Sequence, residues 1–312
     1  MAETFAELVE AMSGRYPAAS GFIRELAALS PNLLRGQIAF LAERRGEAFW
    51  HEAERLVGMA SKFGGSPAVA LIDYTVANLK EQVRFLAGNE YSYTDFEAAR
   101  REVYDNPEVM EKFYLSGLLL SHAFWPIHFD IHTFFRESFL PLIPDSGVGA
   151  EYGFGHGLYI HDILKARPNT RAIGYDISQY SCTFAARLLR ESGIPEDRYQ
   201  LGLADVRDRL PGRDGEYEWA VFAEIMEHLP DPLGPLRDLR RCMKRGAPIF
   251  ITTVVNCNAI DHLYLFSEPG EVNQMLRDAG FEVAVEKAFK VTDYAGNAKD
   301  PSVDLAYVGL AS

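Results

Sequence analysis

The chain has 312 residues, of which 48% are hydrophobic and 24% charged, a composition typical of a packed globular protein and not of a disordered one. It contains 31 lysine and arginine residues against 44 aspartate and glutamate residues, which gives a formal net charge of −13. This excess of acid argues against a protein that binds nucleic acid through its phosphates. At about 150 residues per domain, the length predicts two domains.

Neither a membrane segment nor an export signal is evident. The longest apolar stretch, 113–125, is shorter than the roughly 20 residues that a membrane-spanning helix needs. The first residues are acidic and amphipathic, unlike an export signal. The three cysteines, Cys182, Cys242 and Cys257, are odd in number and far apart, so they predict neither a disulfide framework nor a paired-cysteine motif. We therefore expect reduced thiols, a cytoplasmic location, and no membrane or nucleic-acid partner.

The first half of the chain has helical periodicity throughout. Apolar residues recur three and four apart in 31–60 and again in 66–88. A later helical run is interrupted at Pro126, and an aromatic-rich helix follows over 128–140. The sequence therefore predicts an all-helical domain over residues 1–143, which we interpret as a cap that contributes to substrate binding.

From residue 144 onward, short apolar runs alternate with helical segments. The predicted strands are 148–153, 170–177, 199–206, 217–225, 247–255, 281–289 and 304–311. The predicted helices between them are 158–166, 179–192, 233–244 and 268–279. Strand–helix alternation predicts a mainly parallel α/β sheet covered on both faces, here over 144–312. The last two strands have only the segment 290–303 between them, so an antiparallel pairing is expected there.

The segment 151–157, EYGFGHG, follows a predicted strand and opens a predicted helix. Its glycines allow a sharp turn and a close backbone approach to a ligand, and the helix start supplies N–H donors. Asp176 ends the next strand, 19 residues after Gly157, where an acid can accept both ribose hydroxyls of a nucleoside. Asp205 ends the third strand and is placed to accept a hydrogen bond from an adenine amino group.

Together the segments EYGFGHG, GYDIS, LADVRD and AEIMEHLPDP resemble the motifs of the class I S-adenosylmethionine-dependent methyltransferase family. The resemblance covers about residues 141–312. It implies a Rossmann-like, doubly wound, mainly parallel sheet of seven strands with an antiparallel last strand. It also implies S-adenosyl-L-methionine as the cofactor. The helical first half resembles no family that we can name.

The resemblance also implies which residues hold the cofactor. Three glycines would line its methionine part, Asp176 would bind the ribose, and Asp205 would bind the adenine N6 with Val206 beside the ring. The segment that begins at Glu224 would lie beside the transferring methyl group. The full implied set is Glu151, Gly153, Gly155, Gly157, Asp176, Ile177, Asp205, Val206 and Glu224.

Other interpretations remain open for the cofactor site and for single residues. A NAD-binding site would share the glycines and Asp176, although it would not explain Asp205 and the EHLPDP segment. His228 either fixes a loop or faces the pocket, and we weigh the two evenly. Among the residues after the fifth strand, Asp261, His262 and Tyr264 are candidates for substrate contact.

The densest chemical cluster of the helical half is the segment 124–132. His128 and His132 are four residues apart, so they share one face of a helix, and Asp130 points away from that face. They could bind substrate, act as a base or pack among aromatic rings. We favour packing or substrate binding over a metal site, because the spacing offers no third ligand. No metal is therefore predicted.

The leading hypothesis is a methyltransferase that acts on a small-molecule acceptor through an O, N or C nucleophile by in-line transfer. If the acceptor must lose a proton, the candidate bases are His128, His132, Glu224 and His262. The alternative keeps the cofactor but attacks its methionine γ-carbon and releases methylthioadenosine, through cyclisation to azetidine-2-carboxylate or aminocarboxypropyl transfer. A third hypothesis, a non-catalytic scaffold with a retained fold, fits poorly with the intact glycines and acids.

Overall fold

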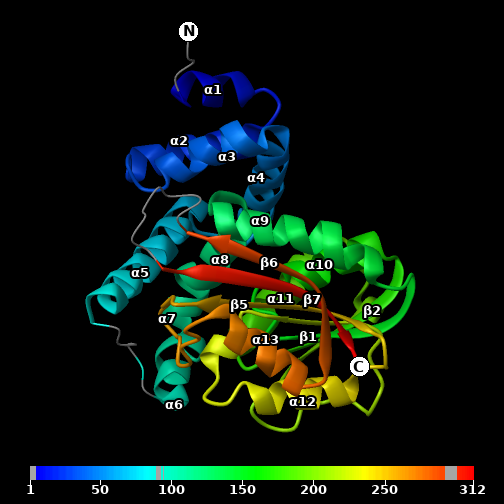
Figure 1. The fold of residues 1–312 in the computed structure, drawn as a ribbon. Coiled ribbons are helices and arrows are strands. Elements are labelled where there is room, and N and C mark those ends of the chain that lie inside the picture. Colours follow the sequence, from blue (N-terminus) through cyan, green and yellow to red (C-terminus); the bar gives the residue numbers. More distant parts are fainter. Residues whose placement is uncertain (1–4, 89–92, 94, 292–300) are drawn as a thin grey trace.

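The computed structural model describes residues 5–88, 93, 95–291 and 301–312. Helices of the first half of the chain stand over one face and one end of a seven-stranded sheet that is formed by the second half (Figure 1). In the described ranges, no strand precedes Ser146. None of the described helices is both long enough and apolar enough to cross a membrane.

The first half forms helices and short π or 3-10 turns. Their bounds are α1 (Phe5–Met12), α2 (Pro17–Leu29), α3 (Arg35–Arg45), α4 (Glu47–Ala60), α5 (Pro67–Gly88), α6 (Phe96–Ala99), η1 (Arg100–Tyr104), α7 (Pro107–Val109), η2 (Met110–Tyr114), α8 (Leu115–Phe124), α9 (Pro126–Phe134), η3 (Phe135–Phe139) and η4 (Leu140–Leu142). The run 31–60, which has helical periodicity, forms two helices, α3 and α4, separated at Gly46, which adopts a φ of 53°. Pro126 begins α9 at its first position, where proline costs no hydrogen bond.

Helix α8 is the centre of the helical half. Nine of its ten residues are buried, and it packs against α4, α5 and α9. Gly117 permits the close approach to α5, since a Cβ there would lie 2.3 Å from the Cβ of Tyr74. The apolar core around α8 extends to Leu158 and Phe184, which belong to helices that follow the first two strands. The two halves therefore share a continuous apolar core.

The sheet contains seven strands in the order β3-β2-β1-β4-β5-β7-β6. They are β1 (Ser146–Tyr152), β2 (Asn169–Asp176), β3 (Tyr199–Leu203), β4 (Ala220–Ala223), β5 (Pro248–Val255), β6 (Phe281–Lys290) and β7 (Val303–Ala311). Strand β1 pairs in parallel with both β2 and β4, and β7 pairs antiparallel with β5 and β6. The predicted fold class is confirmed, and so is the antiparallel last strand. Most of the segment that joins the last two strands lies outside the described residues.

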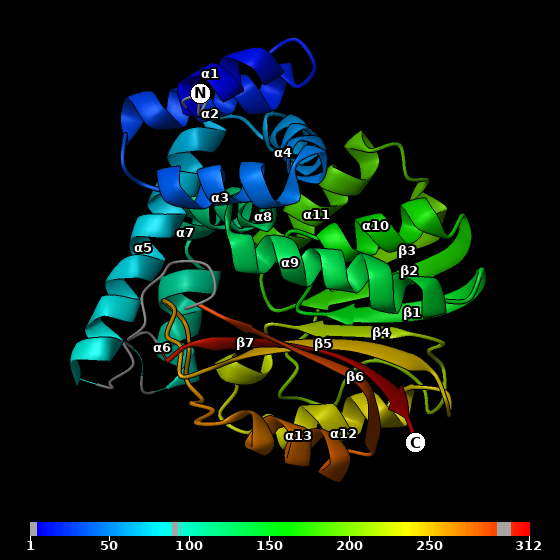
Figure 2. The same ribbon diagram turned by 45° about the horizontal axis from the view of Figure 1, so that its top comes forward.

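Four helices connect the parallel strands and cover both faces of the sheet. Helices α10 (Leu158–Ala166) and α11 (Gln179–Glu191) lie on the face that also carries α9, and α12 (Leu233–Cys242) and α13 (Pro269–Asp278) lie on the opposite face (Figure 2). The aromatic side chains of α9 and η3 pack on the sheet around Phe250. The end of the helical half is thus part of the layer that covers the sheet.

Both outer strands of the sheet have features that weaken their free edges. Strand β3 has only five residues. Strand β6 has a register shift between Val283 and Val285, and charged side chains are exposed along it. The charged residues are Glu282, Glu286, Lys287 and Lys290.

Candidate functional site

A cavity of about 430 Å³ lies where the carboxyl ends of the parallel strands meet the helices of the first half. This edge of an open α/β sheet, beside the strand where the order reverses, is where such folds bind ligands. Side chains from α5, α8 and α9 line one side of the cavity, and the ends of β1, β2, β4 and β5 line the other. A volume of this size lies within the usual range of small-molecule sites, roughly 300–1,000 Å³.

The glycine-rich turn after β1 forms the floor of the cavity. Gly153, Gly155 and Gly157 all have positive φ values, of 69°, 50° and 78°. At Gly153 a Cβ would lie 1.9 Å from the Cδ1 of Ile225, so a side chain there would displace a residue that lines the cavity. Gly157 is the residue before α10 and does not line the cavity. The turn therefore exposes bare backbone to a ligand at its first two glycines.

Two buried carboxylates order this turn. Glu151, at the end of β1, accepts a hydrogen bond from the backbone N–H of Ile160 in α10. Asp176, at the end of β2, accepts the N–H of Gly155 at 2.9 Å and the N–H of Ser178 at 2.8 Å. Burial raises the pKa of both carboxyl groups. Because both line the cavity, they are placed to meet polar groups of a ligand.

Asp205, after β3, lines the cavity and is paired with a basic side chain. Its two carboxylate oxygens accept hydrogen bonds from Arg207, whose guanidinium lies 3.7 Å above the ring of Phe96. Burial opposes the ionised form, yet the hydrogen bonds and charge of Arg207 hold the pKa of Asp205 below its ordinary value. A ligand amino group that binds Asp205 would therefore share this carboxylate with Arg207. The role of Asp205 implied by the sequence did not include this ion pair.

Glu224 follows β4 with a φ of 53°, which is rare for a residue other than glycine. Its backbone N–H is held by the carbonyl and the hydroxyl of Thr252 in β5. Burial, followed by the charge of Glu227, raises the pKa of Glu224 well above its ordinary value. Its Oε1 is buried without a hydrogen-bond partner in the described part of the chain. Strained backbone and an orphaned buried carboxyl oxygen are both typical of ligand sites.

The wall opposite the glycine turn is aromatic. Tyr74 stacks on Trp125 with ring centroids 5.2 Å apart, and it meets Tyr114 edge-on at 5.5 Å. Tyr104 and Tyr114 each end a π turn, and both hydroxyls donate to the Oδ2 of Asp261, at 2.9 and 3.1 Å. All five residues line the cavity, so aromatic faces meet there with one buried carboxylate, Asp261, that accepts two hydrogen bonds.

Three histidines from three elements also line the cavity: His122 on α8, His128 on α9 and His156 in the glycine turn. The ring of His122 lies 5.6 Å from that of His128 and 5.1 Å from that of His156. Burial lowers the pKa of His128 to about 4 and that of His156 to about 3, and it lowers the pKa of His122 well below its ordinary value. The three imidazoles are therefore neutral at pH 7.

The tautomer of His128 follows from its partner. The hydroxyl of Ser121 donates its hydrogen to the carbonyl of Leu118 at 2.7 Å, so it accepts from the Nδ1–H of His128, also at 2.7 Å. The lone pair of the imidazole is then on Nε2. His128 is thus a neutral hydrogen-bond acceptor at the cavity wall.

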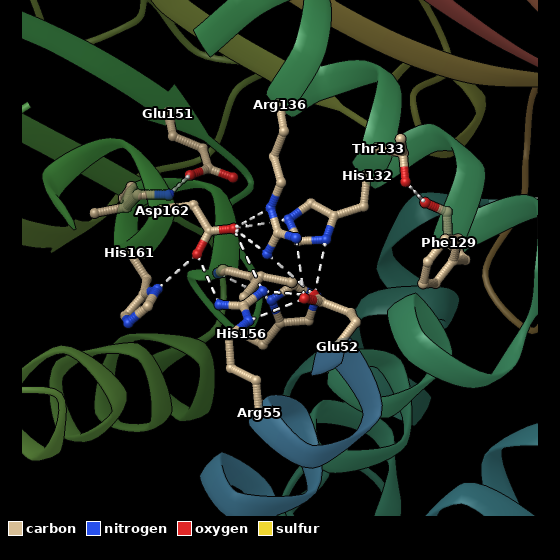
Figure 3. Close-up of polar contacts among 12 residues, drawn as sticks. Glu52, Arg55, Phe129, His132, Thr133, Arg136, Glu151, His156, His161 and Asp162 are labelled. Atoms are coloured by element: carbon tan, nitrogen blue, oxygen red, sulfur yellow. Dashed lines mark hydrogen bonds and ion pairs between the residues drawn. The ribbon is translucent and has the colours of Figure 1, made fainter. Parts of the chain in front are cut away.

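His132 has a different environment, and it does not line the cavity. It belongs to a buried ion cluster with Glu52, Arg55, Arg136 and Asp162 (Figure 3). Its Nδ1 lies 3.2 Å from Glu52, and its Nε2 lies 2.9 Å from Asp162. Asp130 turns to another partner, Arg45, as its predicted orientation away from the two histidines requires.

The ion cluster joins the helical half to α10. Glu52 and Arg55 come from α4, His132 and Arg136 from α9 and η3, and Asp162 from α10. Arg55 and Arg136 each bind both acids, at distances between 2.6 and 3.0 Å. Burial alone would raise the pKa of Asp162, but Arg55 and His132 more than offset it and hold this pKa well below the ordinary value.

The structure thus brings most of the predicted site residues to one cavity. Those that line it are Glu151, Gly153, Gly155, Asp176, Ile177, Asp205, Val206, Glu224, His128 and His262. Those that do not are Gly157 and His132. Residues of the cavity that the sequence analysis passed over include His122, His156 and Tyr104. Of these, only His156 had a sequence signal, because it stands inside the glycine-rich motif.

This fold, with a glycine turn after β1 and acids at the ends of β2 and β3, defines a nucleotide-type site in an α/β protein. Residues 150–249 match the family described as Methyltransferase domain. The chain therefore contains a class I S-adenosylmethionine-dependent methyltransferase domain, and the predicted family and cofactor are both confirmed.

Curated relatives agree with this assignment at low identity. A ubiquinone biosynthesis O-methyltransferase of Pseudomonas paraeruginosa is 25% identical over 153 residues, which are 43% of this chain and 63% of the relative. The protein of the same name from Methylococcus capsulatus is 27% identical over 154 residues, 43% of this chain and 62% of the relative. The matched region thus spans less than two thirds of these relatives.

Solved structures of other proteins share the fold of the sheet domain at low sequence identity. A putative sarcosine dimethylglycine methyltransferase from Galdieria sulphuraria superposes with a TM-score of 0.49 at 9% identity, covering 62% of this chain and 87% of that one. The [4+2]-cyclase SpnF superposes with a TM-score of 0.48 at 18% identity, covering 58% and 78%.

Proposed function

We propose that the chain is an S-adenosylmethionine-dependent methyltransferase that acts on a small-molecule acceptor. The observation that carries this proposal is the cavity itself. The glycine turn and strand-end acids of the methyltransferase domain share one cavity with the aromatic and histidine side chains of the helical half. Such a site can hold a cofactor on one side and an acceptor on the other. In this proposal, residues 1–143 supply the cap and 144–312 supply the cofactor domain.

The residues of the first side fit the cofactor. The exposed backbone at Gly153 and Gly155 suits the methionine part, the buried carboxylate of Asp176 suits two ribose hydroxyls, and Asp205 with Val206 suits the adenine. Glu224 has a buried oxygen that lacks a donor, which the cofactor's amino group would supply. When bound, S-adenosylmethionine supplies a methyl group on a sulfonium centre for in-line transfer. The protein's contribution is then mainly to align the acceptor and to exclude water.

The second side indicates the kind of acceptor. Tyr74, Tyr114 and Trp125 offer flat apolar faces, which favour a planar or apolar molecule. None of the described residues that line the cavity is a lysine or an arginine, so an anionic acceptor would find no counter-charge. The curated relatives are named as O-methyltransferases, which supports a hydroxyl as the nucleophile.

Neutral His128 has a role in this proposal. Its Nε2 can accept the hydrogen of an acceptor hydroxyl or amine and thereby orient the lone pair that attacks. Glu224 and His262 are the other cavity-lining groups that could hold this proton. His132 is assigned a structural role instead, since Glu52 and Asp162 occupy both of its ring nitrogens.

The proposal is tested by the product released from the cofactor. Purified protein is incubated with S-adenosylmethionine, alone and with a pooled metabolite extract, and the products are analysed by mass spectrometry. We expect S-adenosylhomocysteine only when the extract is present, together with a new species heavier by one methylene. Methylthioadenosine formed without any acceptor would contradict methyl transfer and support attack on the γ-carbon of the cofactor.

The two helical histidines should behave differently when substituted. His128→Ala should lower the turnover at saturating cofactor at least tenfold and leave the affinity for S-adenosylhomocysteine unchanged, because it removes a group on the acceptor side. His132→Gln should lower the melting temperature and change turnover little. Turnover and calorimetric affinity for both variants check this. Equal turnover in wild type and His128→Ala would show that His128 has no role in binding or orienting the acceptor.

A further inference from the structure

A second cluster of polar side chains lies at one end of the cavity. Glu227 and His228 belong to the 3-10 turn η6 (Met226–His228) after β4, and His262 lies in the loop after β5. The backbone N–H groups of Leu263 and Tyr264 both donate to the carbonyl of Glu227 at 2.8 Å. These two hydrogen bonds hold the two loops together, so residues 35 positions apart in the sequence become neighbours.

The three side chains converge on one point. A carboxylate oxygen of Glu227 and one ring nitrogen each of His228 and His262 all lie within 4.8 Å of one another. The Nε2 of His228 lies 3.8 Å from the Oε1 of Glu227, and the two imidazole rings are 5.0 Å apart at an angle of 77°. Ligand atoms about 2.1 Å from a tetrahedral ion are roughly 3.4 Å from one another. Small side-chain rotations that move these ligand atoms by about 1 Å would therefore complete the site.

Both histidines are oriented by backbone carbonyl groups. The Nδ1 of His262 lies 3.2 Å from the carbonyl of Cys257, and the Nδ1 of His228 lies 3.1 Å from the carbonyl of Asp261. A carbonyl oxygen can only accept, so in the neutral rings each Nδ1 carries the hydrogen and each Nε2 carries the lone pair. An N–H donated to a carbonyl group behind the ring is the usual outer contact of a metal-binding histidine.

Glu227 supplies the oxygen ligand. Its side chain is fully buried, and Oε2 accepts a hydrogen bond from the hydroxyl of Thr253 at 2.7 Å. Its Oε1 is buried and receives no hydrogen bond from the described residues. A buried carboxylate oxygen without a donor is costly unless a cation or water meets it.

We propose that Glu227, His228 and His262 bind a first-row divalent cation through Oε1 and the two Nε2 atoms. Two imidazoles and one carboxylate favour ions of the Zn²⁺, Fe²⁺ or Co²⁺ kind over Mg²⁺ and Ca²⁺, which prefer oxygen ligands. Both histidines line the cavity, so an ion held by them would border it. Resting on the proposed function, the ion would bind an acceptor hydroxyl and ease the loss of its proton.

Metal binding is measured directly on the full chain, without reference to activity. The protein is dialysed against a chelator and then titrated with Co²⁺, followed by visible absorption, and with Zn²⁺, followed by calorimetry. We expect one ion per chain and a visible Co²⁺ spectrum. His262→Ala and Glu227→Gln should each weaken binding at least tenfold, whereas His51→Ala, at an exposed histidine, should not.

Affinity for S-adenosylhomocysteine and circular dichroism verify that each variant is folded. If Zn²⁺ and Co²⁺ do not bind, or bind wild type and both folded ligand variants equally, the proposal is wrong. Should the ion bind while the extract yields no S-adenosylhomocysteine, the metal site stands and the proposed methyl transfer falls. If the protein binds no ion and methyl transfer still proceeds, the proposed methyl transfer stands and the metal site is wrong.

Discussion

Replacing Asp176 by alanine should weaken the binding of S-adenosylhomocysteine about a hundredfold or more, since two hydrogen bonds to a charged acceptor contribute roughly 1.5–3 kcal/mol each. In the proposed site, Asp176 holds both ribose hydroxyls. The same carboxylate holds the N–H groups of Gly155 and Ser178, so its loss also loosens the glycine turn. Isothermal titration calorimetry measures this change.

Two further variants make this test specific. Asp176→Asn keeps the shape of the side chain and one acceptor oxygen, so its affinity should fall between those of wild type and Asp176→Ala. Asp197→Ala, at an exposed acid, should bind like wild type. If Asp176→Ala and Asp176→Asn both bind S-adenosylhomocysteine with wild-type affinity, the assigned position of the ribose is wrong.

The substitution Asp162→Asn should cost about 3–5 kcal/mol of folding stability, the usual effect of removing one partner from a buried ion cluster. It leaves Arg55 and Arg136 with Glu52 as their one remaining acid within the cluster. For a chain of this size, such a loss lowers the melting temperature by about 5–10 °C. Differential scanning calorimetry at pH 7 measures it.

An exposed ion pair provides the matched control. Arg15, in the turn between α1 and α2, and Glu47, at the start of α4, also form a hydrogen-bonded pair, but both side chains are about 60% exposed. Glu47→Gln should change the melting temperature by no more than about 1 °C, because exposed pairs contribute little. If Asp162→Asn and Glu47→Gln have the same small effect, the buried cluster does not stabilise the junction of the two halves.

The elements of the sheet domain could be predicted closely from the sequence. The helix expected over 158–166 is found as Leu158–Ala166, because Gly157 before it and a regular apolar spacing mark it locally. The site residues after β1, β2 and β4 could be predicted for a related reason. In a parallel sheet the carboxyl ends of the strands meet at one edge, so local order along the chain fixes their proximity.

The environment of the helical histidines could not be predicted in this way. His128 and His132 do share a face, yet their roles depend on partners far away in the sequence. Glu52 is 80 residues before His132 and Asp162 is 30 residues after it, so nothing near the histidine reveals its ion pairs. The break at Gly46 could not be predicted either, because the apolar spacing continues through it.

The outer strands of the sheet influence whether copies of this protein associate edge to edge. An uncovered strand edge with unpaired backbone groups is a template on which another chain can add a strand. Here β3 is too short to offer a long template, and β6 combines the register shift near Val283 with a row of exposed glutamates and lysines. An added strand would meet these charged side chains, and the register shift would interrupt its hydrogen-bond ladder. Strand-by-strand aggregation is therefore disfavoured at both edges.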